Sequence, residues 1–360
     1  MRYSLLRPLL TTLLLAASVT SRAQPLRTFA DSIRKAAHIP ELGYAVVSSS
    51  QVLACATLGV KRIHTTLPAA PDDRFRIGSN TKAVTGMIAA LLVSEQKISW
   101  DTRLFDLFPE LKAGSRPEHY GVTLLDLLTF RTRLFPYTYT YPKPTKDQFT
   151  GTEAEQRYQF TRWCLQQPPV DGTDSIHFSN LGYVAAGLML EKAAGKSYRE
   201  LVGDLNRRLD ISFGFGNPNT TDPSQPWGHD AQLHPEPPGD SYKLGWLQAA
   251  GNLNISLPGY ARFIMEQLKG LNGQSKLLSK AAYTFLHFGR TGFAVGWFWQ
   301  QDEQGRVYSY NIGNPGTFLT QVYVYPGMDR AFILFANAQT EAAAAGLTAL
   351  YRKLRQAYGR

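Results

Sequence analysis

The sequence lacks several patterns that would point to whole classes of protein. Beyond residue 23, no stretch approaches the roughly 20 apolar residues that a membrane-spanning helix needs. No zinc-finger spacing and no basic run with interleaved aromatic residues occur, which argues against a nucleic-acid partner. The histidines, His229 and His287 among them, show no His-Glu-x-x-His or other ligand spacing, so we expect no metal site. The absence of Gly-x-Ser-x-Gly argues against the nucleophile turn of an α/β-hydrolase.

Cysteine is also scarce, since the chain contains only Cys55 and Cys164. In an exported protein these two could form a disulfide. Cys55, however, lies in the apolar stretch 52–58, which is typical of a buried strand, and a free core cysteine fits the sequence as well. Both alternatives stay open at this point.

The first 23 residues have the pattern of a secretory signal peptide. Arg2 and Arg7 precede the apolar run 9–17, and the small residues at 21 and 23 predict cleavage after Ala23. An uncleaved anchor is the weaker alternative, because the apolar run is short. We therefore expect a periplasmic or secreted protein that has no membrane span after cleavage.

The chain is long and apolar enough for one large domain or two lobes, since 44% of the 360 residues of the full sequence are hydrophobic. The formal net charge is +10, and the basic residues are scattered apart from a cluster at 352–355. Such a cluster is typical of cationic residues near the C-terminus of a last helix.

Strands are predicted at both ends of the chain and helices between them. The helices are expected at 25–38, 80–95, 180–196, 258–270 and 340–357, and the strands at 42–48, 51–60, 293–300, 307–311, 318–325 and 331–337. This order predicts an α+β fold with one antiparallel sheet built from both chain ends and flanked by the terminal helices. Within 24–360, residues 24–78 and 285–360 would form this lobe, and residues 79–284 a mostly helical lobe.

One short stretch has the chemistry of an activated nucleophile. Ser79 precedes Lys82 by three residues at the start of a strongly apolar helix, so the two side chains would share one helix face. The positive end of the helix dipole would favour an alkoxide beside the amine. Ser32 and Ser94 also precede a lysine by three residues, but they lie within and at the end of helical segments.

A second stretch, 135–142, is rich in tyrosine and proline and cannot be regular helix. Its aromatic side chains would suit the wall of a cleft, or they would pack a surface loop among themselves. The sequence does not choose between these two interpretations.

Four segments carry a family resemblance. Residues 75–82 (Phe-Arg-Ile-Gly-Ser-Asn-Thr-Lys) contain Ser-x-x-Lys, and residues 125–129 (Leu-Asp-Leu-Leu-Thr) precede the place of a His-Thr-Ser-Gly segment. Residues 178–183 (Phe-Ser-Asn-Leu-Gly-Tyr) stand where Tyr-Ser-Asn-x-Gly-Tyr is expected, and residues 311–318 at a His-x-Gly or Lys-Thr-Gly motif. In this order, the segments resemble the serine β-lactamase and penicillin-binding protein family, in its class C, D-alanyl-D-alanine carboxypeptidase and esterase-like branch.

The resemblance implies acyl transfer through a covalent serine ester, with no metal or organic cofactor. Ser79 would be the nucleophile and Lys82 the residue that accepts or relays its proton. Asn180 would orient Lys82 and the substrate amide. The backbone N–H groups of Ser79 and Asn314 would form an oxyanion hole, which stabilises a tetrahedral intermediate.

Several positions depart from the family pattern. Phe178 replaces the tyrosine that usually acts as general base or acid partner, and a lost acid–base group costs about 10²–10⁴-fold in rate. We expect Phe178 to be a core residue. Asn311 replaces a cationic or imidazole residue at the third motif, where Asn311, Gly313 and Asn314 would bind or orient substrate. Residues 130–133 (Phe-Arg-Thr-Arg) replace His-Thr-Ser-Gly and change one wall of the cleft.

No clear substitute for the missing groups is found in the sequence. His177 should point away from the cleft if its segment is extended. Tyr137, Tyr139, Tyr141 and Tyr310 are the phenols that could stand in, although each is more typical of a packed aromatic residue.

We therefore expect an exported serine hydrolase that cleaves a small ester or amide through acyl-Ser79. Peptidoglycan-type peptides or small esters are favoured over β-lactam antibiotics, because Asn311 offers no positive charge to a carboxylate. The alternative is a catalytically impaired member that binds a ligand or partner in the same cleft.

Overall fold

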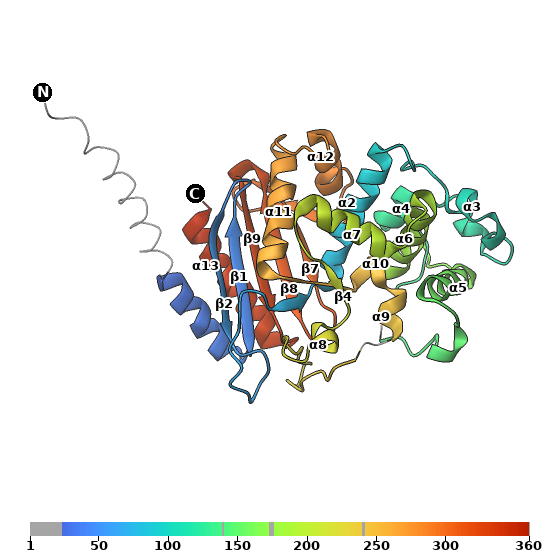
Figure 1. The fold of residues 1–360 in the computed structure, drawn as a ribbon. Coiled ribbons are helices and arrows are strands. Elements are labelled where there is room, and N and C mark those ends of the chain that lie inside the picture. The colour runs from blue at the N-terminus through green and yellow to red at the C-terminus, as the bar shows by residue number, and fades with distance from the viewer. Residues whose placement is uncertain (1–23, 139, 173–175, 240–241, 360) are drawn as a thin grey trace, which may run out of the picture.

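A six-stranded antiparallel sheet forms the larger part of the fold (Figure 1). The computed structural model describes residues 24–138, 140–172, 176–239 and 242–359. The predicted signal peptide and Tyr139 lie outside these residues. The strands follow the order β2-β1-β9-β8-β7-β6, with the bounds β1 Glu41–Val47, β2 Val52–Gly59, β6 Phe298–Gln301, β7 Val307–Gly313, β8 Leu319–Tyr325 and β9 Arg330–Ala336.

The two ends of the chain meet in this sheet. β1 pairs with β9, with Leu42 opposite Ala336, so the first hairpin and the last four strands form one surface. The predicted α+β fold and the sheet built from both chain ends are therefore confirmed. The strand expected at 293–300 begins only at Phe298, because Gly296 has φ +90 and the chain turns there.

Helices cover both faces of the sheet and fill the middle of the chain. Besides a helix over residues 24–36, they are α2 Thr81–Ser94, α3 Leu104–Leu107, α4 Leu124–Leu128, α5 Glu153–Gln166, α6 Asn180–Ala194, α7 Tyr198–Leu209, α8 Pro218–Thr221, α9 Tyr242–Trp246, α10 Gln248–Gly251, α11 Leu257–Leu271, α12 Lys280–Phe288 and α13 Glu341–Tyr358. Short 3-10 turns span Gly78–Asn80, Pro109–Leu111, Pro117–His119, Lys146–Gln148 and Pro326–Met328. None of the helices in the described part of the chain is long and apolar enough to cross a membrane.

The alternation of side chains along β1 explains why the sheet is buried on both faces. Leu42, Tyr44 and Val46 pack with α13 and the helix at 24–36, whereas Ala45 and Val47 face the core that contains α2 and α11. All seven residues of β1 are buried as a result.

α11 lies against the sheet rather than with the helices of the middle lobe (Figure 1). Its Leu257 would be 3.3 Å from a Cβ on Gly43, and the ring centroids of Tyr260 and Phe335 are 5.5 Å apart. This placement differs from the predicted division, which put residues up to 284 in the helical lobe. A small three-stranded sheet also occurs in the middle of the chain, formed by β3 Arg74–Arg76, β5 Leu253–Ser256 and β4 Gly214–Phe215.

α2 runs through the centre of the molecule. Every residue of α2 from Thr81 to Leu92 is buried, because α6, α7, α10 and α12 pack around it. A helix that is mostly apolar around its circumference is typical of such a central position. The start of α2 is therefore held rigidly, which matters for the residues that precede it.

The two cysteines are free. Cys164 is buried in α5, and Cys55 is exposed on β2. Neither alternative left open by the sequence holds for Cys55, since it forms no disulfide with Cys164 and is exposed on the edge strand β2.

Candidate active site

Ser79 lies in a tight turn between the small sheet and α2. β3 pairs with β5, and Ile77 N donates to Leu253 O at 3.0 Å, which brings the chain to a 3-10 turn at Gly78–Asn80. Gly78 has φ +48, and a Cβ at this position would lie 2.8 Å from Asn314 N. Only glycine permits both this backbone conformation and this close approach to the end of β7.

Lys82 follows in the first turn of α2 and points at Ser79. Its Nζ lies 3.1 Å from Ser79 Oγ, 2.8 Å from Asn180 Oδ1 and 2.8 Å from Ala250 O. Lys82 is only 1% exposed, whereas Ser79 is partly open to solvent. The spacing of three residues thus brings the hydroxyl and the amine together, and Asn180 is the third side chain of this group.

The partners of Lys82 determine how its amine is oriented. Carbonyl oxygens can only accept, so Asn180 Oδ1 and Ala250 O each take an N–H group of Lys82. A neutral amine has two N–H groups, and both are then used. Its lone pair is left for the hydroxyl of Ser79, so the neutral form of Lys82 can accept the proton of Ser79.

Burial also favours the neutral form of this amine. Desolvation lowers the pKa of Lys82 from 10.5 to about 7, because a buried site disfavours the charged ammonium. No carboxylate within the described residues forms an ion pair with Lys82 that would oppose this effect. A substantial fraction of Lys82 is therefore neutral near pH 7.

Two aromatic rings flank the amine. Lys82 Nζ lies 5.3 Å from the ring centroid of Phe178 and 5.4 Å from that of Tyr183. Tyr183 is buried and donates its hydroxyl to Leu128 O at 2.8 Å, and burial raises its pKa, so it remains a neutral phenol. Phe178 is 43% exposed, and the prediction that it is a core residue is wrong.

Asn180 connects Lys82 to the aromatic stretch 135–142. Its Nδ2 donates to Tyr137 O at 2.8 Å, which fixes the amide so that Oδ1 faces Lys82. The cap of α6 is Ser179, whose Oγ accepts from Leu181 N and donates to Phe135 O. Asn180 therefore does not cap α6. Both polar atoms of its amide, Oδ1 and Nδ2, hold it in the site.

The aromatic side chains of the stretch 135–142 pack among themselves, as one of the two interpretations predicted. The rings of Tyr137 and Tyr141 stack with centroids 5.6 Å apart, and Phe135 contacts both. The backbone of the same stretch reaches Asn180. Among the phenols considered above, Tyr137 is 1% exposed and Tyr310 stacks on Phe298, and neither forms a hydrogen bond to Lys82 or Ser79 within the described residues.

The end of β7 approaches the turn that holds Ser79. A Cβ on Gly313 would lie 2.0 Å from Ile77 O, so only glycine allows this contact. The N–H groups of Ser79 and Asn314 point to no acceptor among the described residues. Two unused N–H groups beside the hydroxyl of Ser79 are suited to an oxyanion.

Asn311 has a different place from the one predicted. It is 1% exposed, and its Nδ2 donates to Gly296 O at 2.6 Å and to Ser79 O at 3.3 Å. Asn311 thus ties the turn at Ser79 to the loop before β6. Its side chain therefore holds the backbone around Ser79, which differs from the expected role of binding or orienting substrate.

Among residues 130–133, Phe130 supplies an apolar contact beside Phe178. Phe130 is buried with φ +58, and its ring lies 4.7 Å from Phe178 and 4.3 Å from Phe293. Arg131 donates to Thr129 O, Thr291 O and Phe293 O. Its guanidinium therefore joins the backbone near Phe130 to the backbone near Phe293. His177 Nε2 lies 3.2 Å from Gly172 O, on the preceding part of its own segment.

Two contributors to the site were not identified from the sequence. The carbonyl of Ala250 carries no residue-specific signal, although the small residues at 249–251 allow a close approach to α2 and the Ser79 turn. Gly296 with φ +90 lies against Lys82 O and Ala83, and a Cβ there would clash at 2.7 Å. The described chain holds no group of three or more His, Cys, Asp or Glu side chains placed to bind a metal ion.

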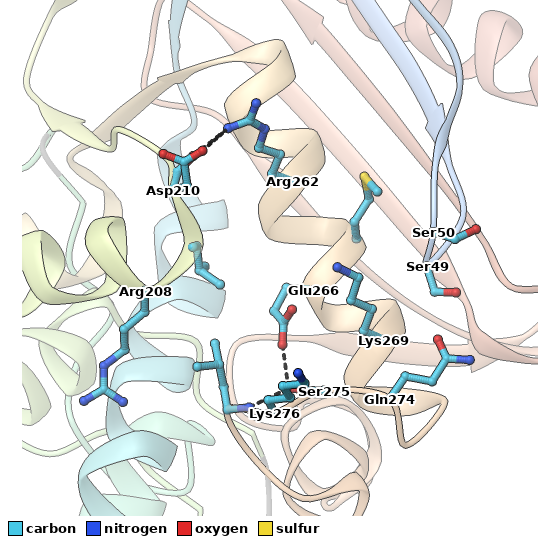
Figure 2. A pocket seen from close by; sticks show the side chains of 13 residues that line it. Ser49, Ser50, Arg208, Asp210, Arg262, Glu266, Lys269, Gln274, Ser275 and Lys276 are labelled. Atoms are coloured by element: carbon cyan, nitrogen blue, oxygen red, sulfur yellow. Dashed lines mark hydrogen bonds and ion pairs between the residues drawn. The ribbon is translucent and has the colours of Figure 1, made fainter.

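A surface hollow of about 540 Å³ lies elsewhere, between the C-terminal ends of α7 and α11 and the loop at 274–277 (Figure 2). None of its lining residues belongs to the group around Ser79. Arg262 pairs with Asp210 at its rim, and Glu266 accepts from Ser275. The chemistry described above therefore has no connection with this hollow.

Known proteins resemble this chain over most of its length. A family model described as Beta-lactamase matches residues 26–357. Among curated proteins, Protein flp of Staphylococcus aureus (strain NCTC 8325 / PS 47) is 19% identical over 327 residues, which cover 88% of this chain. The match covers 64% of that protein's own length, so this chain corresponds to less than two thirds of it.

Solved structures share the fold at low sequence identity. The octameric penicillin-binding protein homologue from Pyrococcus abyssi is 19% identical, with a TM-score of 0.76, and the match covers 94% of this chain and 78% of that one. A class C β-lactamase mutant, in which phenylalanine replaces one tyrosine, is 18% identical with a TM-score of 0.72; the match covers 90% of this chain and 96% of that one. These similarities establish the fold.

Proposed function

Because this chain belongs to the β-lactamase family, we propose that it is a serine hydrolase that cleaves a small ester or amide through an acyl-Ser79 intermediate. The observation that carries the proposal is the set of contacts at Lys82 Nζ. Two carbonyl oxygens hold its N–H groups, and the third direction meets Ser79 Oγ at 3.1 Å.

In the first half of the reaction, Ser79 Oγ attacks the carbonyl carbon of the substrate and gives its proton to neutral Lys82. The negative charge on the carbonyl oxygen is stabilised by the N–H groups of Ser79 and Asn314. Removing one such donor typically costs about 10²–10³-fold in rate. The bond to the leaving oxygen or nitrogen then breaks, and that atom takes the proton from Lys82.

In the second half, water attacks the carbonyl carbon of acyl-Ser79 and gives a proton to Lys82. The bond to Ser79 Oγ breaks, the proton returns from Lys82 to Oγ, and the acid is released. Lys82 thus acts in both halves as the proton acceptor and donor, and it ends in its initial state. Asn180 and Ala250 keep the amine oriented through both steps.

Phe178 supports a second candidate function. A phenyl ring cannot take part in proton transfer, and a missing acid–base group lowers rates by about 10²–10⁴-fold. The alternative is therefore a catalytically impaired protein that binds a ligand or partner at the same site. The depressed pKa of Lys82 favours the hydrolase, because one amine with a pKa near 7 can serve as both base and acid.

The substrate and the location are part of the proposal. We favour small esters or peptidoglycan-type peptides, since Asn311 carries no charge and is buried. The predicted signal peptide over residues 1–23 supports a periplasmic or secreted location.

The proposal is tested by labelling the purified protein with a fluorophosphonate probe and with a fluorescent penicillin. A Ser79→Ala variant serves as the control, and its thermal unfolding is compared with that of the wild type. We expect labelling by the fluorophosphonate that disappears in the variant. Absence of any Ser79-dependent adduct with both probes would reject the hydrolase and leave the binding function.

A further inference from the structure

Exposed apolar side chains occur on the segments that border Lys82. In the described residues, the large apolar side chains that are exposed are Val52, Leu67, Tyr120, Tyr141, Ile176, Phe178, Val307 and Ile312. Tyr141, Ile176 and Phe178 lie on two adjacent segments, which are joined by the hydrogen bonds from Ser179 and Asn180 to the backbone at 135 and 137. Single exposed apolar residues need no explanation, but several together mark a site where an apolar group binds.

Phe178 is the member of this group nearest to the reacting atoms. One side of its ring rests on Phe130, which is itself stacked on Phe293, so the ring has a firm support. Its centroid lies 5.3 Å from Lys82 Nζ, and 43% of the residue is open to solvent. The exposed part of Phe178 therefore forms a surface next to the amine.

Ile176 extends this surface. Ile176 is 40% exposed, while His177, between it and Phe178, turns to Gly172 O. This alternation is typical of an extended segment, in which residues two apart share one side. Ile176 also packs beside Gly292, on the loop that leads to Phe293.

The position of the amine decides which part of a substrate meets Phe178. The leaving atom takes its proton from Lys82, so it must come within about 2.6–3.2 Å of Nζ. The group attached to that atom then lies beside the ring of Phe178. The acyl group, by contrast, is fixed by the bond to Ser79 Oγ and by the oxyanion donors.

The charges around this surface do not favour an anionic group. The buried and partly buried cations near this surface already have partners. Lys82 is bound to three groups, Arg131 donates to three backbone carbonyls, and Lys243 donates to Tyr141 O. Arg290 is exposed on the neighbouring loop, where water screens its charge. A carboxylate placed on Phe178 would lose its hydration, and it would have to compete for these cations with the partners they already have.

We propose that Phe178, extended by Ile176, determines specificity for substrates whose leaving group is apolar and uncharged, such as an aryl-methyl or alkyl alcohol. The inference rests on the proposed function, since it takes Lys82 as the proton donor to the leaving atom. The replacement of a phenol by Phe178 then has a positive role: it provides an apolar contact where the leaving group departs.

The experiment compares acetate esters that share one acyl group and differ only in the alcohol. Methyl, benzyl and 4-carboxybenzyl acetate all form the same acetyl-Ser79, so differences in kcat/KM report only the acylation step. We expect benzyl acetate to exceed methyl acetate by about tenfold or more in kcat/KM, and the 4-carboxy ester to lose most of this advantage.

The variants are Phe178→Ala, Phe178→Leu and, as a matched control far from the site, Leu67→Ala. Phe178→Ala should lower the benzyl-to-methyl ratio about five- to tenfold, Phe178→Leu should lower it less, and Leu67→Ala should leave it unchanged. A general loss of folding or a shifted pKa of Lys82 changes both rates alike and cancels in the ratio.

The outcomes separate this inference from the proposed function. Ser79-dependent hydrolysis with the same ratio in wild type and Phe178→Ala would overturn the inference and leave the hydrolase intact. A wild-type preference for the 4-carboxy ester would also overturn it. No Ser79-dependent hydrolysis of any of the three esters would overturn the inference, and Ser79-dependent labelling by the fluorophosphonate would then decide separately whether the hydrolase stands.

Discussion

The two sides of the site around Lys82 Nζ differ in chemistry. On the side of Ser79, Asn180 and Ala250, every contact of the amine is polar and directed, at 2.8–3.1 Å. On the side of Phe178 and Tyr183, the amine meets the faces of two aromatic rings, and the Tyr183 hydroxyl donates to Leu128 O instead of contacting the amine. The comparison indicates that proton transfer depends on the polar side alone, while the aromatic side keeps the amine dry and neutral.

Removing the amine of Lys82 should abolish the proton transfer from Ser79. Lys82→Met keeps the length and the packing of the side chain but leaves Ser79 without a base. We expect a fall in kcat/KM of about 10³–10⁴-fold for an activated ester, measured by its chromophore. Residual rates within about tenfold of wild type would show that another group takes the proton.

Removing the Asn180 carbonyl that accepts an N–H group of Lys82 should have the next largest effect on kcat/KM. Asn180→Leu removes the carbonyl that holds one N–H group, so the lone pair is no longer directed at Ser79. A loss of about 10–10²-fold in kcat/KM is expected, because misplaced groups lose much of their advantage. Gln248→Leu, which changes a buried amide near the site but not at Lys82, is the control for stability.

Adding a phenol at position 178 tests whether the missing hydroxyl on the aromatic side limits catalysis. Phe178→Tyr supplies a group that can share the proton transfer, and hydrolysis of an unactivated ester should rise by about tenfold or more. Steady-state rates of the variant and of Phe178→Leu measure this directly. An unchanged rate would show that the missing hydroxyl does not limit turnover.

Asn311 should affect stability more than chemistry. Asn311→Ala removes the hydrogen bonds to Gly296 O and Ser79 O and takes the side-chain donor away from the buried Gly296 carbonyl. We expect the free energy of unfolding to fall by about 1–3 kcal/mol, measured by chemical denaturation. An unchanged stability combined with a raised KM would instead restore the predicted contact with substrate.

The parts of the site that the sequence predicted are those that depend on short-range spacing. Ser79 and Lys82 are one helical turn apart, and the segment that contains Asn180 is recognisable by its neighbours, so their positions followed from local patterns. The strands at both ends were also predicted from their apolar runs. The predicted pairing of strands from the two chain ends was also correct, because these strands bury their apolar residues by sharing one sheet.

Long-range packing explains what was missed. Phe178 was expected in the core, but its burial depends on Phe130 and on the loop at 290–293, which lie far away in the sequence. Asn311 was given a role from its motif position, whereas the approach of β7 to the Ser79 turn buries it. The carbonyl of Ala250 could not be found at all, because a backbone oxygen does not depend on the residue type.

The central claim is that one buried amine with a lowered pKa performs the proton transfer. The most direct test is the rate of Ser79 acylation by a neutral fluorophosphonate as a function of pH, with Ser79→Ala subtracted. Neutral Lys82 is needed, and its fraction falls as pH falls below its pKa of about 7. We predict a rate that drops about tenfold per pH unit below this value and levels off above it. A rate that is independent of pH, or one that rises only near the ordinary lysine value of 10.5, would contradict the account.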